Sequence, residues 1–262
     1  GASPQSSCAA LGACARRLMP ERAARAADGR RMADEAIRRA EGYLQTNIDA
    51  IGISICTVDG QQFQYGRTKD SFPLRSIAHV LLYAIAMDER GCDYVHSRVG
   101  TEPVSMPRDT FKLLRHVDGH VLPYNPFLDT GALALSSMIG DSDPGSSFEV
   151  IAKHVSRFAG GRQTAFDQEA YLAFSKAQVR VKALSQFCKG FGILGDEEPD
   201  SVSDIFFQTQ ALDMDCESLS VIAATIANCG LNPTTGVQAF SLEAARKHNL
   251  DPVVFRPAAP KW

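Results

Sequence analysis

The pattern of hydrophobic and polar positions predicts a short β-hairpin followed by a largely helical chain. Apolar β-branched residues alternate with small or polar ones over residues 51–58, which is typical of a strand. Asp59-Gly60 is a tight-turn dipeptide, and residues 62–66 are predicted to form the returning strand. A long apolar run over residues 76–90 then predicts a buried helix.

Helical periodicity recurs along the rest of the chain. Further helices are predicted over residues 21–45, 131–139, 148–158, 167–190, 204–228 and 241–248. Residues 97–130 are rich in Pro, Gly and Asp, which favours a long ordered loop. The predicted fold class is therefore α/β, of the α+β kind and mostly helical.

The predicted domain organisation has three parts. Residues 1–45 are expected to form an N-terminal extension with a basic helix, residues 46–240 a single domain, and residues 241–262 a short helix with a Pro-rich tail. Residues 1–40 carry eight Arg and four acidic residues, which is typical of a mitochondrial targeting segment or of a solvated helix face. We therefore expect a location on the matrix side of the mitochondrion, or otherwise in the cytoplasm.

Composition narrows the class of protein. Of 262 residues, 45% are hydrophobic and 22% charged, and the net charge of −3 offers no general attraction to nucleic acid. The seven Cys are scattered without ligand spacing, which favours reduced thiols. Because no apolar run reaches the ~18–20 residues that span a bilayer, no membrane span is expected.

A candidate nucleophile lies at the start of the helix predicted over residues 76–90. Ser76 is near the helix N-terminus, and His79 is three residues further on the same face. The positive end of the helix dipole and a neighbouring base are what a serine nucleophile needs. The alternatives are a helix-capping hydroxyl and a histidine merely tolerated in the core.

Metal and cofactor sites are not expected. His96, His116 and His120 lie in one loop region, but a zinc site needs converging ligands, and this spacing favours it weakly. Glu102-Pro103 is interpreted as structural. The sequence has no phosphate-binding Gly-rich loop.

Four segments together resemble the serine-dependent glutaminases, which share the β-lactamase-like (transpeptidase-like) fold. The segments lie between about Gly52 and Gly236: GISICTVDG, SFPLRSIAHVLLYAIAMDERGCDYVHSRVGTEPVSMP, PYNPFLDTGALALSSMI and VSDIFFQTQALDMDCESLSVIAATIANCGLNPTTG. The animal mitochondrial type is most similar, through CTVDG, YAIAMDERG and YVHSRVGTEP.

The resemblance implies where the active site lies and that several of its residues have been replaced. In this family a serine attacks the carboxamide of glutamine, and a lysine three residues later takes its proton. Ser76 matches the serine, but His79 occupies the lysine position. The substrate-binding positions correspond to Asp129 in place of Asn, and to Phe174, Val181 and Phe206 in place of polar residues, while Tyr43 stands where the family has a tyrosine before the first strand. Asp129 is interpretable as a new acid, but a single carboxylate near a loop is more often a turn former.

The resemblance also implies that family members continue past the NPTTG segment into strands and an oxyanion segment, and we expect these C-terminal strands to be missing here. The hairpin 51–66 would then have open edges and a bare face. Loss of an oxyanion donor costs ~10²–10³ in rate and loss of a general base ~10²–10⁴. No carboxylate that could orient His79 is evident.

These points predict a catalytically inactive, glutaminase-like accessory subunit of a larger, mitochondrial complex, with no catalytic or substrate-binding residues. Its partners would be other subunits that cover hairpin 51–66 and hold both tails. The first alternative is an active, diverged glutaminase or amidohydrolase that uses Ser76 with His79 as base. The second is an amino-acid-binding sensor without turnover.

Overall fold

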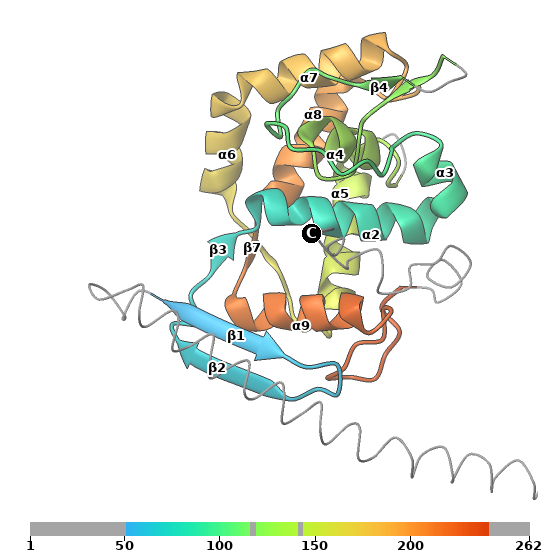
Figure 1. Ribbon diagram of the computed structural model, residues 1–262. Coiled ribbons are helices and arrows are strands. Elements are labelled where there is room, and N and C mark those ends of the chain that lie inside the picture. The colour runs from blue at the N-terminus through green and yellow to red at the C-terminus, as the bar shows by residue number, and fades with distance from the viewer. Residues whose placement is uncertain (1–50, 116–118, 141–143, 241–262) are drawn as a thin grey trace, which may run out of the picture.

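The computed structural model describes residues 51–115, 119–140 and 144–240 (Figure 1). The strands are β1 (Gly52–Cys56), β2 (Gln62–Gly66), β3 (Phe72–Pro73), β4 (Leu114–Arg115), β5 (Val121–Leu122), β6 (Ala165–Phe166) and β7 (Leu212–Met214). The helices are η2 (Arg75–Ile77), α2 (Ala78–Arg90), α3 (Cys92–His96), α4 (Asp129–Ser136), α5 (Pro144–Phe158), α6 (Gln168–Ala177), α7 (Val179–Gly190), α8 (Pro199–Gln210) and α9 (Cys216–Ala227). The helices predicted over 21–45 and 241–248, with Tyr43 and His116, lie outside the described residues.

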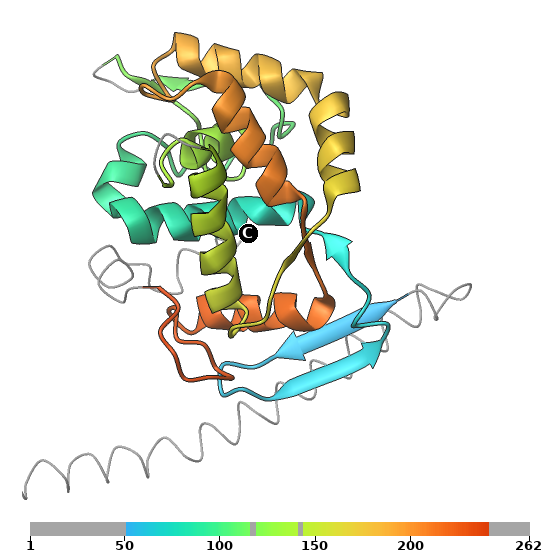
Figure 2. The same cartoon turned by 180° about the vertical axis from the view of Figure 1, so that it is seen from behind.

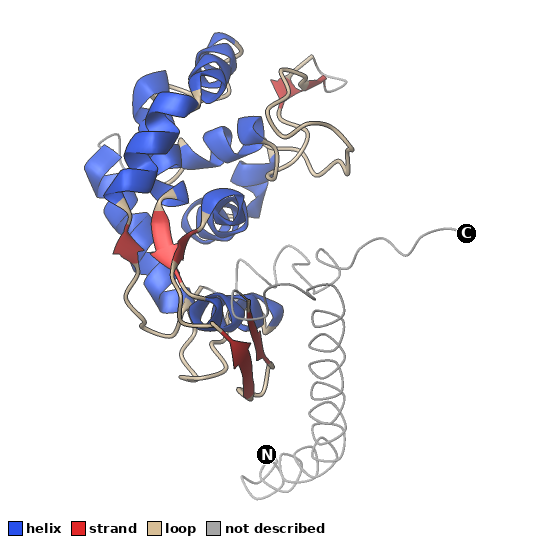
Figure 3. Ribbon diagram, turned by 90° about the vertical axis from the view of Figure 1, so that its left-hand side faces the viewer, coloured by secondary structure: helices blue, strands red, loops and turns tan. Residues whose placement is uncertain are grey.

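The molecule has a helical body, with a hairpin and one helix packed at its end (Figures 1 and 3). Helix α2 runs through the body between α4, α5 and α8, and its side chains enter one continuous core. Leu82 and Ile85 of α2, Leu133 of α4 and Phe206 of α8 are all fully buried. The mixed α/β, mostly helical fold class predicted from the sequence is confirmed.

The hairpin does not have the bare face that the sequence predicted. Helix α9 packs along it in both opposite views (Figures 1 and 2). The Ser54 and Ser220 hydroxyls lie 2.9 Å apart, and the thiol of Cys216 donates to the carbonyl of Gly52 at 3.7 Å. An amphipathic helix from within the same chain therefore covers one face of the sheet.

The helix predicted over 204–228 is in fact two helices separated by a strand. Strand β7 lies between β3 and β6, and it pairs Met214 with Phe72 and Asp213 with Ala165. The carboxylate of Asp215 then accepts from the N–H of Ser218 at 2.7 Å and starts α9. Pairing with two strands distant in sequence overrides the local helical pattern.

Strand β7 also positions the segment that precedes the candidate nucleophile. Leu74 donates its N–H to the carbonyl of Leu212 at 2.9 Å, directly after β3 ends. Ser76 follows two residues later. The central strand of the small sheet therefore fixes where Ser76 emerges.

The structure also differs from the sequence prediction at several element boundaries. Helix α4 begins at Asp129, two residues before the predicted start, and the predicted loop 97–130 contains the strands β4 and β5. The region 167–190 is divided at Gln178 into α6 and α7. In the part of the chain that the structure describes, no helix has the length and apolar character needed to cross a membrane.

Candidate active site

Ser76 lies in the single turn η2, directly before α2, and is exposed. The residue before it, Arg75, has φ of 50°. A side-chain-bearing residue in the left-handed region is unusual and is a strained conformation that often occurs at functional sites. The guanidinium of Arg75 lies 5.1 Å from the centre of the Phe174 ring, which holds this turn against α6.

The hydroxyl of Ser76 is bonded to an arginine from a distant loop. Nη1 of Arg108 donates to Ser76 Oγ at 3.2 Å, and the same nitrogen donates to Asp129 Oδ1 at 3.2 Å. A guanidinium has no acceptor, so Ser76 Oγ is the acceptor in this bond. The hydroxyl hydrogen of Ser76 is therefore left for a base or a substrate.

His79 is buried on the first turn of α2, with 2% of its surface exposed. Its Nδ1 lies 3.0 Å from the carbonyl oxygen of Phe127. Because a carbonyl can only accept, we assign the proton to Nδ1, which leaves the lone pair on Nε2. Nε2 is 3.9 Å from Asp129 Oδ1 and has no hydrogen-bond partner among the described residues.

Burial lowers the pKa of His79 to about 4; the Phe127 carbonyl opposes this shift and the positive charge of Arg108 adds to it. The imidazole is therefore neutral near pH 7, as a proton acceptor must be. The direct Ser76–His79 hydrogen bond expected of a nucleophile and its base is not formed in this arrangement, since Nε2 has no partner. Catalytic hydrogen bonds often tighten only when substrate binds.

A turn built by Asn125 positions the carbonyl that binds His79. Asn125 Oδ1 accepts from the N–H of Phe127 at 3.0 Å and of Leu128 at 3.2 Å. Its Nδ2 donates to the carbonyl of Glu102 at 2.9 Å, which agrees with the structural interpretation of that segment. Gly131 allows the close approach of this turn to α4, because a Cβ there would lie 2.0 Å from the Asn125 carbonyl oxygen.

Asp129 is a buried member of the site and the first residue of α4, whereas the sequence favoured a turn former. Burial raises the pKa of its carboxyl, and the nearby Arg108 partly opposes the shift. Its Oδ2 has no hydrogen-bond partner among the described residues. Asp129 is therefore a carboxyl group close to His79, but the bond that orients the imidazole comes from the Phe127 carbonyl.

Of the three other substrate-binding positions that the resemblance implies, two lie beside residues of the site. The ring of Phe206, on α8, lies 5.6 Å from the ring of His79. Phe174 contacts Arg75, next to Ser76. Val181 is buried on α7, and the structure records no contact that joins it to Ser76.

Arg108 is the site residue that sequence reasoning missed. It lies in an irregular loop in which no periodicity predicts which side chain points inward. The one available signal was that Asp129, if buried, would need a positive partner.

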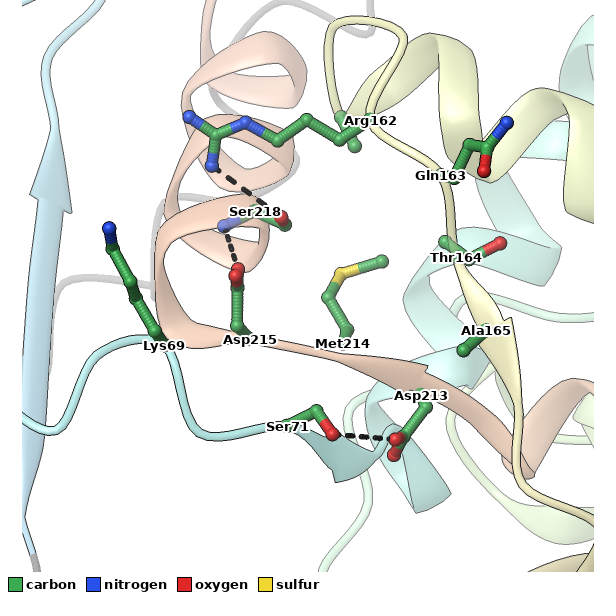
Figure 4. Close-up of a pocket in the computed structure, with 11 residues that line it drawn as sticks. Lys69, Ser71, Arg162, Gln163, Thr164, Ala165, Asp213, Met214, Asp215 and Ser218 are labelled. Atoms are coloured by element: carbon green, nitrogen blue, oxygen red, sulfur yellow. Dashed lines mark hydrogen bonds between the residues drawn. The ribbon is translucent and has the colours of Figure 1, made fainter.

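Two hollows lie elsewhere in the described part of the molecule. A polar one of about 150 Å³ is lined by Lys69, Arg162, Asp213 and Ser218 near the start of α9 (Figure 4). A larger cleft of about 590 Å³ is lined by His96, His120 and residues that follow α7. No group of three potential metal ligands occurs within residues 51–115, 119–140 and 144–240.

Comparison with known proteins identifies the family. The family model described as Glutaminase matches residues 43–250. The liver isoform of mitochondrial glutaminase from Rattus norvegicus is 34% identical over 210 residues, which cover 77% of this chain and 33% of that protein. A glutaminase from Trichormus variabilis is 33% identical over 197 residues, which cover 75% of this chain and 58% of that protein. The chain thus spans about a third to three fifths of the length of these relatives.

Solved structures agree on the fold. A probable glutaminase from Bacillus subtilis superposes with a TM-score of 0.68 at 23% identity, over 75% of this chain and 62% of that one. A Bacillus glutaminase crystallised in 4.3 M NaCl gives a TM-score of 0.68 at 22% identity, over 75% and 65% of the two chains. The predicted β-lactamase-like glutaminase fold is confirmed.

These matches overturn the predicted function. The prediction of a catalytically inactive accessory subunit in a larger complex is wrong, because the family model covers most of the chain and the relatives bear the name of an enzyme. The cluster around Ser76 also contains a hydroxyl, an imidazole, a guanidinium and a carboxyl group. The chain belongs to the glutaminase family.

Proposed function

We propose that this chain is an active, diverged glutaminase that hydrolyses the side-chain amide of glutamine, with Ser76 as nucleophile and His79 as base. The observation that carries the proposal is the exposed Ser76 hydroxyl, which is bonded to Arg108 in one polar cluster with Asp129 and His79. Homology to proteins named glutaminase supplies the substrate class.

In the acylation step, Ser76 Oγ forms a bond to the amide carbon while its proton passes to Nε2 of His79. Collapse of the tetrahedral intermediate breaks the C–N bond, and the imidazolium returns the proton to the departing ammonia. Water then attacks the acyl-serine ester with His79 as base, which releases glutamate and restores Ser76. The carboxyl group of Asp129, 3.9 Å from Nε2, is placed to stabilise the imidazolium when ionised.

The phenyl ring of Phe206 and the carbonyl of Phe127 have complementary roles. The carbonyl fixes the tautomer that leaves the Nε2 lone pair free, and the ring packs at 5.6 Å against the imidazole and helps to exclude water. His79 thereby remains neutral and oriented, which is the state in which it accepts a proton.

The test is ammonia release from L-glutamine by the purified full chain. We expect the wild type to release ammonia, and S76A to lose the activity while retaining its melting temperature, because Ser76 is exposed. S175A is the matched control, since Ser175 is partly exposed and its hydroxyl only donates to the Leu172 carbonyl at 3.2 Å. Absence of activity in the wild type, or equal activity in S76A, would contradict the proposal.

A further inference from the structure

We propose that Arg108 is a catalytic residue of this site, which supplies the positive charge that stabilises the developing oxyanion of Ser76 and of the tetrahedral intermediate. The inference rests on the proposed function, because it assigns a role within the same reaction. It adds a residue from a loop outside the serine-and-base pair.

Arg108 contacts the nucleophilic atom directly. Nη1 of Arg108 reaches Ser76 Oγ at 3.2 Å, the atom on which charge develops when the proton leaves. A charge-assisted hydrogen bond to an alkoxide is stronger than one to the neutral hydroxyl. The bond therefore strengthens while the proton leaves Ser76 Oγ, which lowers the barrier to attack rather than only aiding binding.

Other cationic groups near Ser76 do not take this role. The imidazole of His79 is neutral in this structure, so it provides no positive charge before it takes the proton. Arg75 directly precedes Ser76, but its guanidinium packs on the Phe174 ring. Among the described residues, Arg108 is the cation recorded in contact with the Ser76 hydroxyl.

Arg108 is preorganised by its contacts with Asp129. The backbone carbonyl of Arg108 accepts from the N–H of Asp129 at 2.8 Å, and its side chain donates to the Asp129 carboxyl at 3.2 Å. The next residue, Asp109, is paired with Arg180 of α7. The backbone and the guanidinium of Arg108 are thus both held by hydrogen bonds. The side chain therefore needs little reorganisation when negative charge develops beside it.

A purely structural role for Arg108 would be to neutralise Asp129. That role explains the bond to the buried carboxyl but not the second bond from the same nitrogen to Ser76. Half of the Arg108 side-chain surface is exposed, whereas Asp129 is fully buried. The guanidinium therefore lies at the boundary between the buried acid and solvent, in contact with the exposed Ser76 hydroxyl.

The experiment measures the reactivity of Ser76 without relying on glutamine. An uncharged fluorophosphonate reacts with a nucleophilic serine: an Oγ–P bond forms, the P–F bond breaks, fluoride leaves and the serine proton passes to the base. The second-order rate of labelling is followed by intact mass, with S76A as the blank. The variants are R108K, R108Q and R108Q/D129N. R67Q is the matched control, because Arg67 is also a partly exposed arginine paired with a carboxylate, Asp70.

We expect R108Q to slow labelling by about 10²- to 10³-fold, as loss of an oxyanion donor does elsewhere. R108Q/D129N removes the uncompensated buried acid and keeps the protein folded, yet it should remain as slow as R108Q. R108K keeps the charge without the guanidinium fork and should recover part of the rate. R67Q should label like the wild type.

A folded R108Q/D129N variant that labels as fast as the wild type would overturn the inference. If labelling depends on Arg108 but glutamine is not hydrolysed, only the proposed function fails. If glutamine is hydrolysed and all Arg108 variants retain the wild-type rates, only the role of Arg108 fails. Absence of any labelling in the wild type would overturn both.

Discussion

Arg108 and Asp129 are joined twice, once through the backbone and once through their side chains. The Arg108 carbonyl accepts from the Asp129 N–H at 2.8 Å, and its Nη1 donates to the Asp129 carboxyl at 3.2 Å. The pair connects an irregular loop to the start of α4, and through Ser76 to the start of α2. The site is thus held together by one buried acid and its cation.

This pair predicts a specific pH dependence of the stability of R108Q. Burial raises the pKa of the Asp129 carboxyl above its ordinary value of 3.8, and Arg108 opposes that rise. A raised pKa means that the folded state holds the proton more tightly, so stability falls as the pH rises through the folded pKa. Without Arg108 the pKa rises further, so R108Q should lose more stability at pH 8 than at pH 5.

Urea unfolding at the two pH values measures this difference, and D129N is the control background. In R108Q/D129N the additional loss at pH 8 should disappear, because the amide does not ionise. An equal loss for R108Q at both pH values would show that Asp129 is not the group that Arg108 neutralises.

The lowered pKa of His79 predicts that the stability of the fold depends on pH in the opposite direction. Its pKa is lowered from 6.5 to about 4. Between these two pH values His79 is therefore protonated in the unfolded chain and neutral in the folded protein. Stability should therefore fall as the pH drops from about 6.5 to about 4, by about 3 kcal/mol in total for a shift of this size. H79N should lack this component, so the difference in unfolding free energy between wild type and H79N should shrink between pH 7 and pH 4.5. A difference that stays constant over that range would contradict the buried, neutral histidine.

The lowered pKa of His79 also predicts how the activity depends on pH. The base must be neutral to accept the Ser76 proton, and a pKa of about 4 keeps it neutral well into the acid range. The acidic limb of kcat/KM for glutamine should therefore have its midpoint near pH 4, provided that the protein stays folded. A midpoint near 6.5 would mean that the free enzyme carries a solvated histidine at position 79.

Gly131 should be essential for the turn that holds His79. An added Cβ would lie 2.0 Å from the Asn125 carbonyl, so G131A should destabilise the fold by about 1–3 kcal/mol through overpacking and should also lower activity. Gly190 is the matched helical control, because nothing lies within 4 Å of its added Cβ. G190A should be neutral or should stabilise by about 0.4–1 kcal/mol, measured by urea unfolding. If both variants behaved alike, the close approach at Gly131 would not be real.

Much of the fold and part of the site could be predicted from the sequence. The alternation over residues 51–66 gave the hairpin, and the long apolar run gave α2 with Ser76 at its start. Strand β7 could not be found in this way, because three residues between two helices carry no periodicity of their own and are fixed by pairing with Phe72 and Ala165. The capping residue Asp215 was the local signal that a new helix begins there.

The sequence matched Ser76, His79 and Asp129 to positions of the family motif but expected no catalytic or substrate-binding role for them. Arg108 was not found, because loop conformation decides which of its residues reaches the buried acid. The prediction of lost activity counted His79 and Asp129 among several coincident losses. His79 and Asp129 lie 3.9 Å apart, so they differ from the family pattern as a contacting pair rather than as two independent losses.

Attack of Ser76 on the glutamine amide carbon is tested most directly with a glutamine analogue that carries an electrophilic carbon in place of the amide, followed by peptide mapping of the full chain. We predict a single adduct on Ser76, absent in S76A and suppressed by excess glutamine. No adduct, or an adduct on another residue that persists in S76A, would contradict the account.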